Sequence, residues 1–158
     1  MEKVKFFDLV LIKKVAVHHL TLFKHRIQVE GKDKTGARFR PYSQKYRERK
    51  ARGFKKKDGS PSLAKAISGR ALNTQISPPN FTLTGTTMRS VEIENERSDG
   101  YSFTWGGEPG LIVEGNMEKG RDIVGVPGNE ADKVLRFLGI KMEQYLNKTI
   151  KNVTVNTR

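Results

Sequence analysis

The sequence predicts a single α+β domain over residues 1–158, in which an antiparallel β-sheet of about four strands packs against N- and C-terminal helices beside a long basic loop. Three observations support this fold class. Apolar residues recur at three- and four-residue spacing near both ends of the chain, alternate at period two in its middle, and lose any period in a basic segment between. A chain of 158 residues is also long enough to bury a core of its own.

The first predicted element is a helix over residues 6–29. Its apolar side chains form one stripe at helical spacing, namely Leu9, Ile12, Ala16, Leu20, Phe23 and Ile27. Polar side chains fall on the opposite face, namely Lys14, His18, Thr21 and His25. Gly31 is expected to end this helix. Because β-branched residues are frequent here, a strand over residues 9–12 is the alternative.

Residues 32–61 are predicted to form a long loop, because they show no hydrophobic period. One helical turn is expected near residues 43–51, and a short helix over residues 62–72. Residues 32–70 contain 14 Lys and Arg residues against three acidic residues, so most of the formal net charge of +13 lies in one block. The large apolar anchors of this loop are Phe39, Tyr42, Tyr46 and Phe54.

The basic loop is the strongest functional feature that charge and composition provide. Its cationic side chains can neutralise phosphates while its aromatic side chains stack on bases, as in a nucleic-acid-binding protein. A solvated, flexible arm is the alternative, and the charges alone favour neither interpretation. The side chains assigned to partner docking or nucleic-acid contact are Lys32, Lys34, Arg38, Arg40, Lys45, Arg47, Arg49, Lys50, Arg52, Lys55, Lys56 and Lys57.

The sheet is predicted within residues 81–126. Two alternating runs, residues 91–96 and 101–105, flank an Asp-Gly pair that suits a tight hairpin turn. Each run places its large apolar side chains on one face. Two further short strands are expected at residues 111–113 and 122–126.

The first hairpin strand also carries a row of acidic residues on its polar face, namely Glu92, Glu94 and Glu96. A row of carboxylates can hold a divalent cation. However, no His or Asp nearby would add a ligand to such a cation site, so an exposed acidic face is the favoured interpretation. The basic loop would complement this row across a subunit boundary. We therefore expect a head-to-tail contact between copies, of the kind that closes into rings.

The last predicted element is a helix over residues 129–151. Asn129 is expected to cap it, and its predicted buried stripe consists of Ala131, Val134, Leu135, Leu138, Met142, Tyr145 and Leu146. Gly139 lies inside this helix at a cost of about 1 kcal/mol relative to alanine. A kink or a close packing contact is expected there.

Catalytic chemistry finds little support in the sequence. The absence of cysteine excludes disulfides, thiolate metal sites and cysteine nucleophiles. The seven-residue spacing of His18 and His25 does not match the i, i+4 pair of a zinc helix, and no Ser-His-Asp arrangement follows from spacing. We therefore expect neither an enzyme nor a cofactor. Two lysines interrupt the apolar run at residues 9–12, so no membrane span is expected.

Two short motifs occur in order along the chain. The first consists of Gly36, Phe39, Pro41, Tyr42 and Ser43, followed by Lys50, and the second of Leu83, Thr84, Gly85, Met88, Ser90 and Val91. In residue types, order and separation they resemble the tailed-bacteriophage virion morphogenesis proteins, also called tail-completion or tail-to-head joining proteins. The resemblance covers about residues 30–126 and continues loosely in residues 112–115 and 136–140.

The resemblance implies a structural virion protein at the neck or the head-proximal end of the tail. Such proteins form rings of six or twelve copies that join head-completion or portal-adaptor proteins to the tail, with contact to packaged DNA and none to membranes. The host cytoplasm is the place of assembly. A standalone basic nucleic-acid-binding protein is the alternative. It predicts an affinity that falls steeply with salt concentration.

Overall fold

The computed structural model describes residues 8–54, 73–80, 85–97 and 99–155, with side chains as far as Lys148. The predicted helix over residues 62–72 lies outside these ranges, as do Lys55, Lys56, Lys57, Leu83 and Thr84. The described helices and strands are α1 (Leu9–His25), the π-helical turn η1 (Arg26–Glu30), α2 (Gln44–Ala51), α4 (Thr86–Arg89), β1 (Val91–Arg97), β2 (Gly100–Trp105), α5 (Glu108–Met117) and α6 (Gly128–Val155). The fold is therefore α+β, as predicted.

α1 confirms the predicted N-terminal helix and excludes a strand over residues 9–12. The Asp8 side chain caps its first turn by accepting a hydrogen bond of 3.2 Å from the backbone N–H of Val10. After η1, Gly31 ends the helical stretch with a φ of +65°. Glycine reaches this left-handed conformation without the steric cost of a side chain, so the predicted stop is confirmed.

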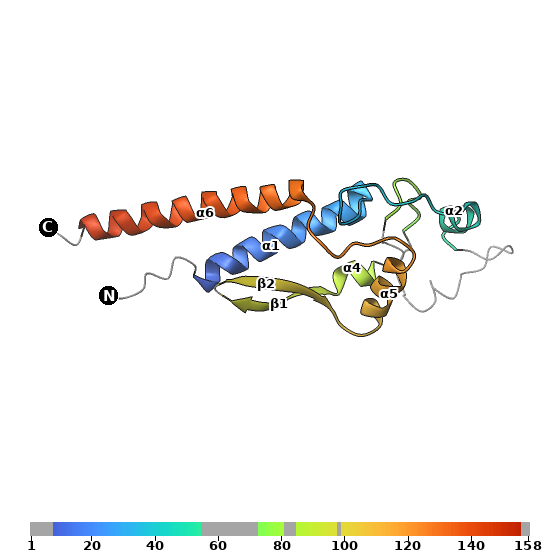
Figure 1. The fold of residues 1–158 in the computed structure, drawn as a ribbon, viewed down its shortest axis with the longest axis horizontal. Helices are drawn as coiled ribbons and strands as arrows, with labels where there is room; N and C mark the ends of the chain where they lie inside the picture. Colours follow the sequence, from blue (N-terminus) through green and yellow to red (C-terminus); the bar gives the residue numbers. More distant parts are fainter. Residues whose placement is uncertain (1–7, 55–72, 81–84, 98, 156–158) are drawn as a thin grey trace.

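The buried face of α1 is broader than the predicted stripe. Leu11, Val15 and His19 are buried although the stripe did not include them, whereas Leu9 is exposed. The reason is visible in Figure 1, where α1 lies between α6 on one side and the hairpin on the other. A helix in a middle layer buries two sides, so a single stripe underestimates its core residues.

β1 and β2 form the predicted antiparallel hairpin, which is the one sheet of the described residues. Its register pairs Val91 with Trp105. The register shifts after Glu94, where Asn95 adopts a φ of +52°. Such a bulge interrupts the strict alternation of side chains between the two faces of a strand.

The two further strands that the sequence predicted are not present in the described residues. Residues 111–113 belong to α5, where Gly107 has a φ of +57° and Pro109 occupies the first turn. Proline is favoured in the first turn of a helix because its missing N–H has no helical partner there. Residues 122–126 pair with no strand, since the side chain of Arg26 binds two of their carbonyl groups.

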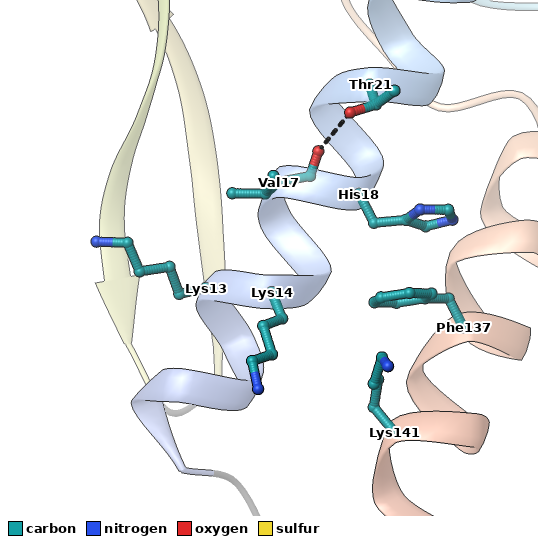
Figure 2. Close-up of a pocket in the computed structure, with 7 residues that line it drawn as sticks. All are labelled: Lys13, Lys14, Val17, His18, Thr21, Phe137 and Lys141. Carbon is teal, nitrogen blue, oxygen red and sulfur yellow. Dashed lines mark hydrogen bonds between the residues drawn. The ribbon is translucent and has the colours of Figure 1, made fainter.

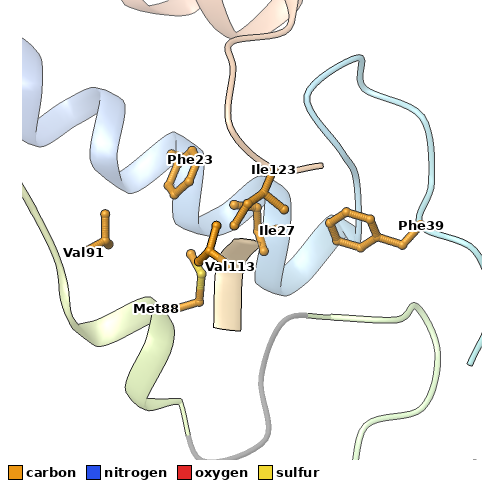
Figure 3. Close-up of a cluster of buried hydrophobic side chains, with 7 residues drawn as sticks. All are labelled: Phe23, Ile27, Phe39, Met88, Val91, Val113 and Ile123. Atoms are coloured by element: carbon orange, nitrogen blue, oxygen red, sulfur yellow. The ribbon is translucent and has the colours of Figure 1, made fainter. Parts of the chain in front are cut away.

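The core gathers side chains from segments far apart in the sequence (Figure 3). α1 and η1 contribute Phe23 and Ile27, and the hairpin contributes Val91. The remaining members come from the basic segment, α4, α5 and the segment before α6, namely Phe39, Met88, Val113 and Ile123. The start of the basic segment is therefore anchored in the core rather than extended away from it.

α6 runs along α1 and then continues beyond the start of α1 (Figure 1). Its predicted buried stripe is only partly covered: Leu135 is 62% exposed and Tyr145 and Leu146 are exposed as well, whereas the other members of the stripe are half-buried, namely Ala131, Val134, Leu138 and Met142. Glu130 is the one buried residue among the described side chains of α6. The close packing contact expected at Gly139 is also absent, because an added Cβ there would meet no atom within 4 Å. Amphipathic periodicity predicted this helix correctly but not what covers its apolar side.

Candidate interaction surfaces

Arg26, at the start of η1, is buried and connects three segments of the chain. Its Nε donates a hydrogen bond of 2.6 Å to Glu130 Oε2 of α6. Nη1 donates to the carbonyls of Lys32 at 3.3 Å and Asp33 at 2.7 Å, and Nη2 donates to those of Ile123 at 3.3 Å and Gly125 at 2.9 Å. One guanidinium thereby positions the start of the basic segment against the segment that precedes α6.

His19 extends this network toward the hairpin. Its Nε2 lies 3.2 Å from Glu130 Oε1, and its Nδ1 lies 2.9 Å from the hydroxyl oxygen of Tyr101 in β2. Burial alone would raise the pKa of Glu130, but His19 and Arg26 together hold that pKa below its usual value. No sequence pattern indicates this network, apart from a histidine and an arginine at positions that face the core.

Lys50, from the set assigned to docking, is fully buried. Its Nζ donates to Asn80 Oδ1 at 2.8 Å and to the hydroxyl of Tyr42 at 3.3 Å. Tyr42 in turn donates to the carbonyl of Asn80 and accepts from the N–H of Asn80 at 2.9 Å. Burial lowers the pKa of Lys50 to about 8. Lys50 therefore holds α2 to the segment at residue 80 and is not available to a partner.

Among the other described residues of the set assigned to docking, two form ion pairs and the other six lie exposed at the surface. Lys32 Nζ lies 2.7 Å from Glu30 Oε2, and Lys34 Nζ lies 2.6 Å from Asp122 Oδ2. The exposed basic surface, as we call it, consists of Arg38, Arg40, Lys45, Arg47, Arg49 and Arg52. α2 supplies three of these side chains, and its capping residue Ser43 accepts a hydrogen bond of 3.4 Å from the N–H of Tyr46. The predicted helical turn near residues 43–51 is thus confirmed as α2.

The predicted acidic row is interrupted. Glu92 and Glu94 are exposed on β1, but the bulge at Asn95 separates them from Glu96. Glu96 is half-buried, and its Oε2 lies 3.9 Å from Lys13 Nζ of α1. Of the three glutamates, Glu92 and Glu94 are therefore the ones exposed enough to contact another chain.

The residues of the two motifs serve mainly to fix the backbone. Gly36 has a φ of +85°, Phe39 lies in the core, and Pro41 is exposed just before the buried Tyr42. In the second motif Gly85 has a φ of +78° and begins α4, Met88 is buried, and the Ser90 hydroxyl donates 3.0 Å to the Thr87 carbonyl. Both motifs therefore occupy the places where the basic segment and the hairpin join the core.

A groove of about 390 Å³ lies between α1 and α6 (Figure 2). The His18 ring stacks on Phe137 of α6 with centroids 4.1 Å apart, so the predicted solvated face of α1 is partly covered. Lys141 Nζ lies 5.3 Å from the centroid of the Phe137 ring. The residues that line the groove are Lys13, Lys14, Val17, His18, Thr21, Phe137 and Lys141. We call this surface the α1–α6 groove.

No protein-family model matches this chain, and neither the curated proteins nor the solved structures give a match. The resemblance to tail-completion proteins thus rests on the two motifs alone. Within the described residues, no cluster of His, Asp and Glu is large enough to suggest a metal site. The helices of that part of the chain are also too short or too polar to cross a membrane.

Proposed function

We propose that this protein is a structural subunit of a tailed-phage virion that forms a ring at the head–tail interface. The observation that carries this proposal is the partly uncovered apolar stripe of α6, in which Leu135, Tyr145 and Leu146 are exposed. Monomeric soluble proteins seldom leave a contiguous apolar patch open to water, and such patches mark contact sites for other chains. The stripe fits a subunit whose neighbours complete its surface.

In this proposal the protein has no catalytic activity and needs no cofactor. The buried ionisable groups support a structural use, because each connects elements of the fold. Glu130 connects α6 to Arg26 and His19, and Lys50 connects α2 to Asn80. Glu130 lines a space of only about 20 Å³, whereas an acid–base catalyst would present such a group to a pocket large enough for a substrate.

The exposed basic surface is proposed to dock against a negatively charged neighbouring ring of head-completion or tail proteins. The other use of these charges, lining the channel through which DNA leaves, is less favourable, because a strongly positive wall would retain a passing duplex. Reversing Lys45, Arg47 and Arg49 of this surface to glutamate distinguishes the two uses. Docking predicts a defect in neck assembly, whereas a channel role predicts altered DNA retention in assembled particles.

A basic nucleic-acid-binding protein is the second candidate. It is supported by α2, in which Lys45, Arg47 and Arg49 are exposed and Tyr46 lies 5.5 Å from the ring of Phe54. Cations beside aromatic rings are the usual composition of a single-strand binding surface. This candidate predicts that the logarithm of the affinity falls linearly with the logarithm of the salt concentration.

Negative-stain electron microscopy of the purified protein tests the ring directly. Closed rings with six or twelve subunits are the expected result. Single small particles, together with DNA binding that weakens steeply as salt is added, would support the second candidate instead. Arg47→Glu together with Arg49→Glu should abolish that DNA binding if α2 is responsible, and should leave rings intact if the virion proposal holds.

A further inference from the structure

The exposed face of α5 combines apolar and acidic side chains. Leu111 is 68% exposed and Ile112 is 42% exposed, whereas Val113 points into the core. With 3.6 residues per turn, Glu108 and Glu114 each lie about one turn from Leu111 on the helix surface. Both glutamates are exposed, and α5 contains neither lysine nor arginine. The face is therefore an apolar pair between two carboxylates.

The α1–α6 groove has the opposite charge and a similar apolar content. Val17 is 50% exposed at its edge, and Phe137 of α6 faces His18 of α1 across the groove (Figure 2). Lys14 and Lys141 come from the two helices that form its walls, and α1 contains no acidic residue. Lys13 also lines the groove, but its ammonium group forms an ion pair with Glu96. An aromatic ring and an exposed valine with lysines around them are the complement of the α5 face.

The two surfaces lie on different parts of the same molecule. α1 separates the groove from the hairpin, and α5 lies beyond the hairpin, next to α4 (Figure 1). We propose that α5 of one copy docks into the α1–α6 groove of the next copy. Because two different patches meet, the contact is heterologous, and repeating it generates a ring or a filament. The inference rests on the self-association that the proposed function requires, and it supplies the surfaces for it.

The chemistry of the contact favours a second copy over an unrelated occupant. Burying Leu111 and Ile112 against Val17 and Phe137 removes apolar surface from water on both sides. The glutamates of α5 then lie near the lysines of the groove, and complementary charges fix the orientation of docking more than they add affinity. The contact should therefore weaken with salt without being abolished.

Charge exchange between two variants tests this contact. The groove variant carries Lys14→Glu and Lys141→Glu, and the α5 variant carries Glu108→Lys and Glu114→Lys. Each variant alone brings like charges together, so we expect the protein concentration needed for half-assembly to rise roughly tenfold or more. An equimolar mixture restores both contacts in alternation, because the acidic groove accepts the basic α5 and the basic groove accepts the acidic α5. Sedimentation velocity of the variants and of the mixture measures assembly.

A control variant separates the contact from net charge. Arg97→Glu with Lys133→Glu makes the same charge change as the groove variant at exposed positions outside the groove, α5 and the exposed basic surface, and its assembly should equal that of the wild type. Thermal unfolding of all variants checks that they are folded. Since every substituted side chain is exposed or at a groove wall, each should unfold within a few degrees of the wild type.

Disulfide trapping gives a second measurement that does not depend on charge. The chain has no cysteine of its own, so a Val17→Cys variant and a Leu111→Cys variant each carry one thiol. Mixed and mildly oxidised, they should form a disulfide-linked heterodimer. A Gln44→Cys variant in place of Leu111→Cys should not.

The outcomes separate this contact from the proposed ring. If the wild type assembles while the groove and α5 variants assemble equally well, the α5 contact is overturned and the ring proposal stands. If the wild type remains monomeric and the Val17→Cys and Leu111→Cys variants form no linked dimer, both are overturned. Restoration of assembly by the mixture alone supports both.

Discussion

Arg26 Nε and Glu130 Oε2 lie 2.6 Å apart although 104 residues separate them in the chain. The four other hydrogen bonds of the same guanidinium go to backbone carbonyls, two at the start of the basic segment and two in the segment before α6. This one side chain thus fixes where α6 begins and where the basic segment leaves the core. Both the α1–α6 groove and the exposed basic surface depend on that placement.

Glu130→Ala should lower the free energy of unfolding by about 3–5 kcal/mol. Removing one partner of a buried ion pair leaves the other charge uncompensated, and that costs more than the pair itself contributes. Urea denaturation measures the change. Glu143→Ala, on an exposed position of the same helix, should stay within about 0.5 kcal/mol of the wild type. Equal small effects of both substitutions would contradict a central role for Arg26.

Stability should also fall in acid through Glu130. Its pKa is lower in the folded protein than in the unfolded chain, so the carboxylate contributes stability above the unfolded value of 4.5 and loses it as pH falls through the folded value. Glu130→Gln cannot titrate and should show a flatter pH dependence below about pH 5. The free energy of unfolding at several pH values measures this, and parallel curves for the two proteins would contradict it.

Lys50 should act in the alkaline range with the same sign as Glu130, because folding lowers the pKa of both groups. Its folded pKa of about 8 lies below the usual value of 10.5, so the unfolded chain binds more protons between these values. Stability should therefore rise with pH from about 8 to 10, by up to about 1 kcal/mol per pH unit. Lys50→Met should remove this rise while keeping the volume of the side chain. A wild type whose stability is flat over this range would show that the amine is not buried.

Gly31 and Gly139 should respond oppositely to substitution by alanine. A Cβ at Gly31 would lie 2.4 Å from the carbonyl oxygen of Pro79, and the φ of +65° disfavours any side chain. Gly31→Ala should therefore cost more than about 1–2 kcal/mol. Gly139 lies in an open part of α6, so Gly139→Ala should stabilise the protein by about 0.5–1 kcal/mol. Thermal unfolding of both variants checks the prediction, and a stabilising effect at residue 31 would contradict it.

Local sequence patterns predicted the terminal helices and the hairpin because short-range spacing determines them. The apolar run at residues 111–113 predicts a strand wrongly, because a run of this length fits a strand and a buried helix turn equally well. The periodicity of α6 reveals an apolar face, but it does not show whether the partner of that face belongs to the same chain.

The buried polar contacts had no comparable local signal. Lysine is almost never fully buried, so the sequence places Lys50 among the exposed cations, whereas in the structure it is buried and contacts Tyr42 and Asn80. The pair of Arg26 and Glu130 joins residues with no spacing relationship at all. Contacts of this range follow from the packing of the whole domain, which a pattern in a short window cannot encode.

The central claim, that other copies of this chain complete its surface, is tested most directly by the mass of the protein in solution. Light scattering at low and high salt should give six or twelve times the mass of one chain. Leu135→Glu places a charge on the exposed stripe of α6 and should reduce that mass, whereas Lys133→Gln, on a polar position of the same helix, should not. A wild type with the mass of a single chain at every concentration and salt, unchanged by Leu135→Glu, would contradict the account.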